Sequence, residues 1–204
     1  MCMNLLFQLI ISNLIAILLA SFSLPPDSSE IWLVNKNSSL WVDGKTNINS
    51  FSCLIQNYNK YDTITFEVKK TILNQFKTIG RLDLTVGEFD CKLQIMTKDL
   101  QKTFKSKEYP FMYIKFTFFS NLPSTLLKNQ VIKGNAEITL VGKTRKYEIE
   151  YIVNSGGNNE IELTGSRQVL FSEFDLKAPS KLGGIIKVKD ELEVEVNLQL
   201  KRLQ

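Results

Sequence analysis

Residues 190–203, DELEVEVNLQLKRL, decide the fold because apolar and polar side chains alternate along them without a break. A period of two is typical of an antiparallel strand that buries one face and exposes the other to water. The sequence therefore predicts a half-buried strand here, and its apolar face comprises Leu192, Val194, Val196, Leu198 and Leu200.

The same alternation recurs through most of the chain. It is clear in residues 64–70, 134–141 and 146–153, and short turns rich in Gly, Asn, Lys and Thr follow at 142–145 and 156–159. Apolar stretches at 31–36, 39–44 and 161–170, with those around Cys53 and Cys91, bring the number of expected strands to eight or more. Many short strands joined by turns predict an all-β sandwich or a closed barrel.

The stretch at residues 96–118, MTKDLQKTFKSKEYPFMYIKFTF, changes character halfway along. A short helix is expected around residues 97–107, since Leu100 and Phe104 can share a face and Pro110 would stop it. The strand from Phe111 is apolar on both faces, so a second apolar layer should cover its outer side. A helix that caps a barrel mouth and a helix on the flank of a sandwich both fit this pattern.

The N-terminus has the outline of a secretory signal. Residues 5–20 are almost wholly apolar, and small residues precede a cut after Ser23. Residues 1–23 are therefore predicted to be a signal peptide. An uncleaved anchor stays open as the alternative, although the apolar run is shorter than the roughly 20 residues that span a membrane. Either way, the domain at residues 30–204 is expected outside the cytoplasm, in the periplasm or secreted.

Loss of the signal would remove Cys2 and leave Cys53 and Cys91 as an even pair. Outside the cytoplasm such a pair tends to form a disulfide, which would stabilise the fold by about 4 kcal/mol on the chain-entropy model. Two buried free thiols are the alternative. Two cysteines without a histidine do not supply the four ligands of a structural metal site, so we expect no metal.

The composition argues against several functions. The net charge is only +4, which is not the footprint of a nucleic-acid-binding protein. The absence of histidine removes the commonest general base and the Ser-His and Cys-His pairs. A hydrolase would need paired carboxylates, for which the candidates are Asp83, Glu88, Asp90 and Asp99. We therefore expect no enzyme and no cofactor.

Several segments resemble the YceI-like family in order and spacing. Residues 96–100 (MTKDL), 104–106 (FKS) and 109–110 (YP) are similar to its helical turn before a strand, and 134–144 and 174–179 resemble two later segments. Residues 44–53 and 86–91 look like the subgroup with a paired cysteine, which implies the Cys53–Cys91 disulfide. The sequence departs from the family in lacking its histidines and in having Leu176 where Gly is usual.

The resemblance implies an antiparallel, eight-stranded lipocalin-like β-barrel with a short capping helix, and a non-catalytic role in binding, carrying or sequestering an isoprenoid-type lipid, polyprenyl or quinone-like. The barrel interior would be lined by Phe66, Phe111, Ile114, Phe116, Phe118, Ile138, Leu140 and Val196, although ordinary core packing explains each of them equally well. Charged candidates for a lipid head group are Lys105, Lys107, Lys143 and Arg145. A cell-envelope interaction module with a filled barrel is the alternative, and a homodimer stays open.

Overall fold

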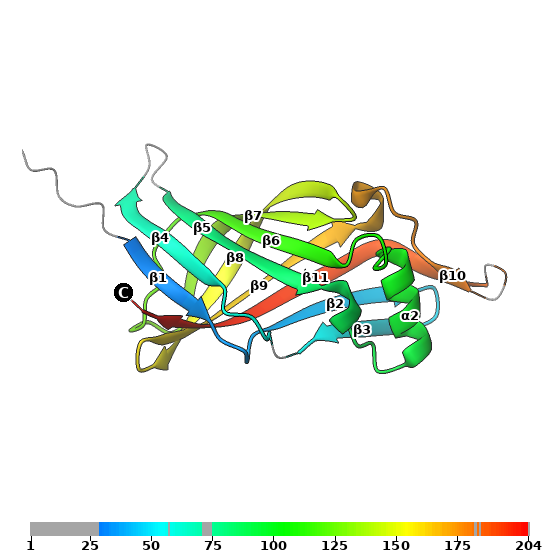
Figure 1. Ribbon diagram of the computed structural model, residues 1–204, viewed down its shortest axis with the longest axis horizontal. Helices are drawn as coiled ribbons and strands as arrows, with labels where there is room; N and C mark the ends of the chain where they lie inside the picture. Colours follow the sequence, from blue (N-terminus) through cyan, green and yellow to red (C-terminus); the bar gives the residue numbers. More distant parts are fainter. Residues whose placement is uncertain (1–28, 57, 71–74, 182, 184, 204) are drawn as a thin grey trace, which may run out of the picture.

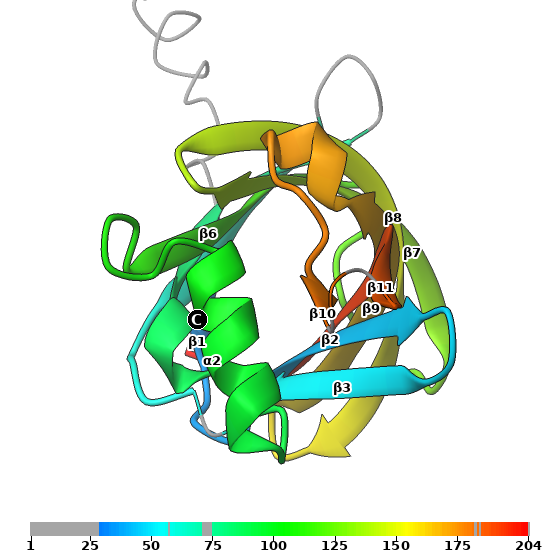
Figure 2. The ribbon, with the colours of Figure 1, turned by 90° about the vertical axis from the view of Figure 1, so that its right-hand side faces the viewer.

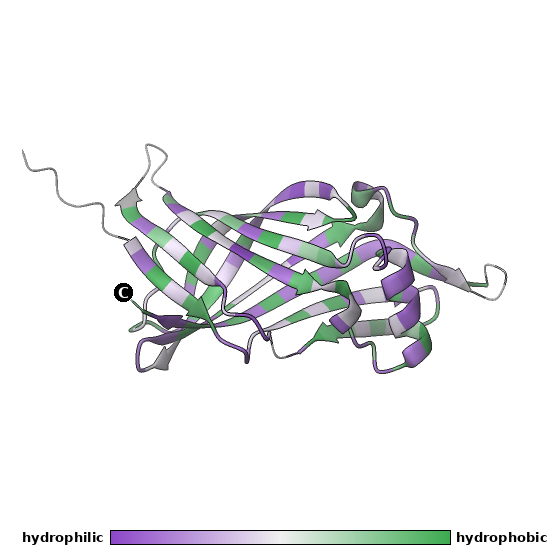
Figure 3. Cartoon of the chain, in the orientation of Figure 1, coloured by the Kyte–Doolittle hydropathy of each residue, from purple (hydrophilic) through white to green (hydrophobic). Residues whose placement is uncertain are grey.

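The computed structural model describes residues 29–56, 58–70, 75–181, 183 and 185–203. The predicted signal peptide or anchor, residues 1–23, lies outside the described residues. Strands dominate the described chain, as the alternation predicts. Figure 3 shows this pattern directly, because hydrophilic and hydrophobic residues follow one another along most strands.

The strands and helices follow the predicted segments closely. The strands are β1 (Ser29–Val34), β2 (Ser39–Thr46), β3 (Ser50–Ile55), β4 (Thr63–Lys70), β5 (Phe76–Thr85), β6 (Phe111–Phe119), β7 (Gln130–Leu140), β8 (Lys143–Gly157), β9 (Glu160–Leu170), β10 (Ser180–Lys181) and β11 (Ile186–Arg202). The α-helix is α2 (Gln94–Thr103), and two short 3-10 helices are η1 (Val86–Glu88) and η2 (Phe171–Phe174).

Eight strands form a closed antiparallel ring in the order β1-β4-β5-β6-β7-β8-β9-β11, and the pairing of β1 with β11 closes it. The hairpin β2–β3 continues the sheet from β11, and β10 pairs with β11 (Figure 1). The predicted eight-stranded lipocalin-like barrel is therefore confirmed, and the sandwich is excluded.

Strand β11 joins the beginning of the described chain to its end. One edge of β11 pairs with β9 from Glu191 to Lys201. The other edge pairs first with β2, from Val188 to Asn197, and then with β1, from Leu200 to Arg202. With β10, which pairs near its start, this single strand of 17 residues therefore holds four others in register.

The wall of the barrel divides toward one end, because β1 pairs with β4 whereas β2 pairs with β3. Between β3 and the segment after β5, the described residues form an isolated bridge of two 2.9 Å backbone hydrogen bonds between Leu54 and Asp90. Helix α2 lies across this end, as the end-on view of Figure 2 shows. We call this end the mouth, and the opposite end, where β1 pairs with β4, the closed end.

Helix α2 is the predicted capping helix, but its bounds differ from the expected 97–107. It begins at Gln94 and ends at Thr103. Lys105 takes a left-handed conformation with φ of 49°, and the N–H of Ser106 donates to the carbonyl of Gln101 at 2.9 Å. This arrangement is a Schellman motif, in which backbone hydrogen bonds around a left-handed residue end the helix. Pro110 therefore lies beyond the helix and does not stop it.

Aromatic side chains fill the barrel toward the closed end. The ring of Phe66 packs against Trp32, with centroids 6.5 Å apart, and against Phe119 at 5.4 Å. Phe119 in turn packs on Tyr151 at 5.2 Å. A Cβ at Gly165 would lie 2.3 Å from the Tyr151 ring, so only glycine lets that ring lie against the wall.

A second aromatic group lies at the mouth. Phe104, at the end of α2, has its ring centroid 6.0 Å from Phe89 and 6.3 Å from Phe171 of η2. All three are buried. They anchor the helix to two different parts of the barrel rim.

Candidate functional site

A largely apolar pocket of about 470 Å³ opens at the mouth. It lies between α2, the β2–β3 turn, η2 and the start of β11. Pockets of 300–1,000 Å³ with mainly apolar walls are typical of sites for small organic ligands. The lining residues are Thr46, Ile48, Asn49, Ser50, Phe51, Cys53, Leu93, Ile95, Met96, Asp99, Leu100, Phe171, Pro179, Ile186 and Val188.

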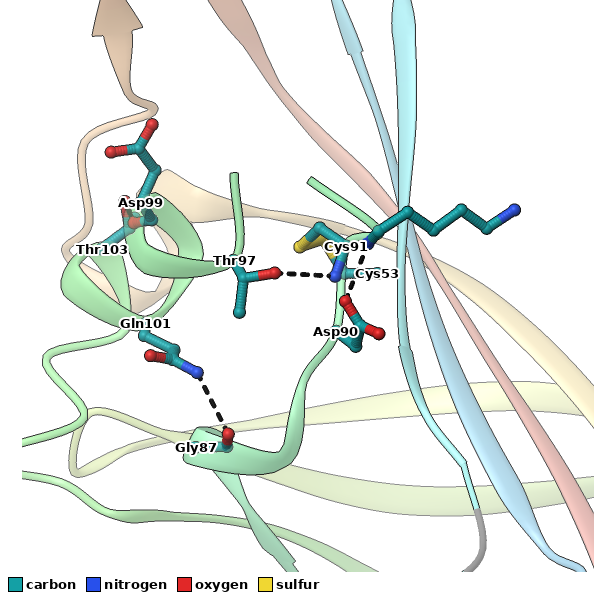
Figure 4. The surroundings of a disulfide bond; sticks show 9 residues. Cys53, Gly87, Asp90, Cys91, Thr97, Asp99, Gln101 and Thr103 are labelled. Atoms are coloured by element: carbon teal, nitrogen blue, oxygen red, sulfur yellow. Dashed lines mark hydrogen bonds between the residues drawn. A yellow bond between two sulfur atoms is a disulfide. The ribbon is translucent and has the colours of Figure 1, made fainter. Parts of the chain in front are cut away.

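Cys53 lines the pocket, and its disulfide with Cys91 confirms the predicted pairing. The disulfide links β3 to the segment before α2, where the barrel wall lacks regular strand pairing (Figure 4). The N–H of Cys91 donates to the Thr97 hydroxyl at 3.0 Å, and the Gln101 amide donates to the Gly87 carbonyl at 3.0 Å. These bonds fix α2 to the segment that carries the disulfide, and so fix one side of the pocket.

The opposite side of the pocket is held by Asn47 in the β2–β3 turn. Its side-chain amide donates to the Ile185 carbonyl at 2.9 Å, and its carbonyl oxygen accepts from the Lys187 N–H at 2.9 Å. The Asn47 N–H donates to the Lys187 carbonyl at 3.0 Å. Three bonds therefore hold the β2–β3 turn against the start of β11.

A second groove of about 550 Å³ lies beside the pocket and shares Ser50, Phe51, Leu93 and Met96 with it. Its remaining lining is more polar, with Asp43, Lys45, Lys92, Lys189, Glu191 and Glu193 among its residues. The shared side chains therefore separate a polar surface from an apolar one.

Below the mouth, the interior formed by the described residues is packed. The voids there are about 10 Å³ each, which is close to the space of one water molecule. The structure buries six of the predicted interior residues: Phe66, Ile114, Phe116, Ile138, Leu140 and Val196. None of them lines the mouth pocket, and a role for them in ligand binding stays a prediction.

Phe111 and Phe118 do not lie in the interior, so the prediction is wrong for these two. Phe111 is 40% exposed. Phe118 is half-buried and lies opposite Lys77, an exposed residue of β5. The pairing of β6 with β7 shifts between Phe116 and Phe118, and this irregularity reverses the alternation, so that Phe119 enters the interior instead.

On the outer face of β6, two aromatic rings have cationic side chains as neighbours. The Lys60 amine lies 5.0 Å from the centroid of the Phe111 ring, and the Arg81 guanidinium carbon lies 4.8 Å from that of Tyr113. Cations over aromatic faces are favourable contacts that remain partly solvated. Charged groups, and not the expected apolar layer, therefore lie over these two rings.

The four predicted head-group residues lie outside the mouth pocket, two in the turn after α2 and two at the start of β8. Lys105 and Lys107 are exposed in the turn after α2. The Lys143 amine forms an ion pair with Asp175 at 2.9 Å, and this contact lowers the pKa of the Asp175 carboxyl. Arg145 pairs with the buried Ile138, so the register places it on the inward-facing side of β8.

Arg167 on β9 is a second inward-facing arginine, and the sequence interpretation missed it. It lies opposite the buried Val194, and its guanidinium carbon is 5.8 Å from the centroid of the Tyr147 ring. The period-two pattern of residues 161–169 could have found it, because Arg167 shares a face with Ile161 and Val169.

Tyr147 lies near both arginines. Its hydroxyl donates to Glu173 at 2.7 Å. Burial raises the pKa of Tyr147, the hydrogen bond to Glu173 raises it further, and the charges of Arg145 and Arg167 lower it by less. This group therefore stays protonated at neutral pH and can act as a hydrogen-bond donor.

The carboxylates considered for a hydrolase lie in different parts of the structure. Asp83 accepts two hydrogen bonds from Arg81, Asp90 accepts from the Lys92 N–H, and Asp99 lines the mouth pocket. Within the described part of the chain, no cluster of three His, Cys, Asp or Glu residues is arranged to hold a metal ion. No helix there has the length and apolar character needed to cross a membrane.

No protein-family model matches the chain, and no curated protein matches it. Solved structures resemble it in fold. BcnA of Burkholderia cenocepacia superposes with a TM-score of 0.57 and 15% identity, covering 79% of this chain and 95% of BcnA. A polyisoprenoid binding domain from Saccharophagus degradans gives 0.57 and 7%, covering 83% and 97%.

The chain therefore shares the barrel fold of these two proteins. This confirms the structural part of the resemblance seen in the motifs. A YceI protein of Campylobacter jejuni gives a TM-score of 0.49 at 14% identity and covers 70% of this chain and 81% of its own.

Proposed function

We propose that this chain binds, carries or sequesters an amphiphilic lipid of the isoprenoid type without transforming it chemically. The observation that carries the proposal is the apolar pocket of about 470 Å³ at the mouth. The polyisoprenoid binding domain among the structural neighbours, which shares the fold, supports the same class of ligand. The apolar tail would lie between α2 and the β2–β3 turn, because the interior below is packed.

Burial of the tail supplies the affinity. Each methylene removed from water contributes about 0.8 kcal/mol, so a few isoprene units bind without any polar partner. Met96, Leu100 and Val188 provide an apolar wall for such a tail. Specificity then comes from the length of the pocket and from the groups around it.

Arg145 and Arg167 are the proposed partners of an anionic or carbonyl-bearing head group. They face inward from neighbouring strands. Within the described residues neither forms an ion pair. Guanidinium groups bind phosphate and carboxylate oxygens with well-defined geometry. Lys143 is a weaker candidate because Asp175 already binds it.

We infer that the protein acts outside the cytoplasm. The Cys53–Cys91 disulfide is compatible with an oxidising compartment such as the periplasm. Residues 1–23 would direct the export.

Native mass spectrometry of the exported protein, followed by lipid extraction, tests the proposal. We expect a stoichiometric prenyl lipid in the purified protein, or uptake of added geranylgeraniol. Val188→Trp should reduce uptake about tenfold or more, because the larger side chain would occupy part of the pocket volume. Val131→Trp, on an exposed strand position at the closed end, is the matched control and should bind normally.

A protein that carries no lipid and takes up none would contradict the proposal. The alternative, an interaction module with a filled barrel, would then account for the packed interior, whose voids are only about 10 Å³ each. Equal uptake by both tryptophan variants would show instead that the lipid binds elsewhere than in the mouth pocket.

A further inference from the structure

We propose that the mouth of the barrel docks onto an anionic lipid bilayer, through an apolar rim formed by Ile48, Leu93, Ile95 and Ile185. The inference deepens the proposed function and rests on it for one point, namely that a lipid passes between the bilayer and the mouth pocket.

The rim residues are large apolar side chains that point into solvent. Ile48 is 62% exposed, Leu93 60%, Ile95 65% and Ile185 71%. Single exposed apolar residues are ordinary on protein surfaces, but a group of them at one end of a molecule marks an interaction surface.

Three separate segments bring the rim together. Ile48 lies in the β2–β3 turn, and Ile185 directly precedes β11. The hydrogen bond from Asn47 to the Ile185 carbonyl fixes these two segments side by side. Leu93 and Ile95, at the start of α2, line the same pocket as Ile48. The rim therefore surrounds the pocket entrance.

Charge around the rim complements an anionic surface. Lys45, Lys92, Lys187 and Lys189 are exposed next to the rim segments, and none forms an ion pair among the described residues. The acidic residues Asp43, Glu191 and Glu193 lie farther back along β2 and β11. Two residues along a strand correspond to about 7 Å. Lys45 and Lys189 therefore lie about 7 Å closer to the rim than Asp43 and Glu191. Asp99 is the acidic residue in the pocket lining.

The combination of apolar and cationic side chains on this surface matches the interface of an anionic bilayer. Apolar side chains with neighbouring lysines are typical of segments that insert shallowly into the interface of anionic membranes. Because the rim surrounds an apolar pocket, a lipid tail could move from the acyl chains to the pocket without exposure to water. The observed combination of rim, lysines and pocket therefore points to one docking face.

Vesicle co-sedimentation of the disulfide-bonded domain tests the inference. We expect binding to phosphatidylcholine vesicles that contain phosphatidylglycerol, and weak binding to phosphatidylcholine alone. Ile48→Asn/Ile95→Asn should lower the apparent affinity about tenfold or more. Lys45→Gln/Lys187→Gln should remove most of the preference for anionic vesicles and the sensitivity to salt.

The closed end offers a matched control. Val131 and Ile152 are exposed apolar residues that face each other across β7 and β8. Val131→Asn/Ile152→Asn removes the same kind of surface at the other end and should leave vesicle binding unchanged. Far-UV circular dichroism and urea unfolding should report the native fold for all three double variants, since every substituted position is exposed.

Three results would overturn the inference. They are no binding of the native protein to anionic vesicles, unchanged binding of Ile48→Asn/Ile95→Asn, and an equal loss in the closed-end control. Uptake of geranylgeraniol without vesicles separates this inference from the proposed function. Docking without uptake would refute the lipid pocket and leave the docking face, whereas uptake without docking would do the reverse.

Discussion

The two ends of the barrel use their apolar residues differently. At the closed end, β1 pairs with β4, and the rings of Trp32, Phe66 and Phe119 pack inside with almost no exposure. At the mouth, a disulfide and a single bridge replace strand pairing, and isoleucines point into solvent around a pocket. The comparison indicates that the closed end is held by strand pairing and packed rings, whereas the mouth is held by a crosslink and keeps apolar side chains exposed.

The largest expected effect comes from removing a ring at the closed end. Phe66→Ala should lower the free energy of unfolding by about 3–5 kcal/mol, because Phe66 is completely buried between Trp32 and Phe119. Ile95→Ala, at the exposed rim of the mouth, should change it by less than about 0.5 kcal/mol. Urea unfolding measures both. Equal losses of unfolding free energy for Phe66→Ala and Ile95→Ala would refute the proposed difference between the two ends.

The disulfide is the second largest effect, and it belongs to the mouth. Replacing both Cys53 and Cys91 by alanine should destabilise the protein by about 4 kcal/mol, since the crosslink closes a long loop of the unfolded chain. The pocket wall should loosen as well, so that geranylgeraniol uptake weakens more than in a closed-end variant of similar stability. Urea unfolding with and without reductant checks the first point. Unchanged uptake would show that α2 and its hydrogen bonds hold the pocket without the disulfide.

The smallest predicted effect tests how completely the interior is packed. The Tyr151 hydroxyl is buried without a hydrogen-bond partner among the described residues, and burial raises the pKa of this group. An unsatisfied buried hydroxyl costs free energy, so Tyr151→Phe should stabilise the protein by about 1 kcal/mol. Thermal or urea unfolding gives the sign. A loss of stability would mean that the hydroxyl binds a water or a ligand group in the adjacent void of about 10 Å³.

Much of the fold could be predicted from the sequence, because a barrel strand buries one face and so alternates regularly. Residues 190–203 predicted β11, and residues 146–153 predicted the middle of β8. The irregularity in β6 could not be predicted, since one extra residue reverses the alternation without any signal in composition. That is why Phe118 was predicted inside, whereas Phe119 is the residue that enters the interior.

The candidate site was less accessible to sequence reasoning than the fold. The mouth pocket is built from turns and helix ends, such as Ile48, Leu93 and Ile186, where apolar residues have no period to reveal them. Six of the eight predicted interior residues are buried in the barrel, Phe111 and Phe118 are not, and none of the eight lines the mouth pocket. Arg167 could have been found from the sequence, because it lies on the inward-facing side of a regularly alternating strand.

Strand β11 has a consequence for the order of events during folding. It pairs with β1 and β2 across more than a hundred residues of sequence, so the ring cannot close until the last strand is available. Contacts of such large sequence separation form slowly, because the loop entropy must be overcome first. A chain that still lacks β11 therefore cannot have a closed ring, because both the β1 and the β9 partner edges stay unpaired until β11 is present.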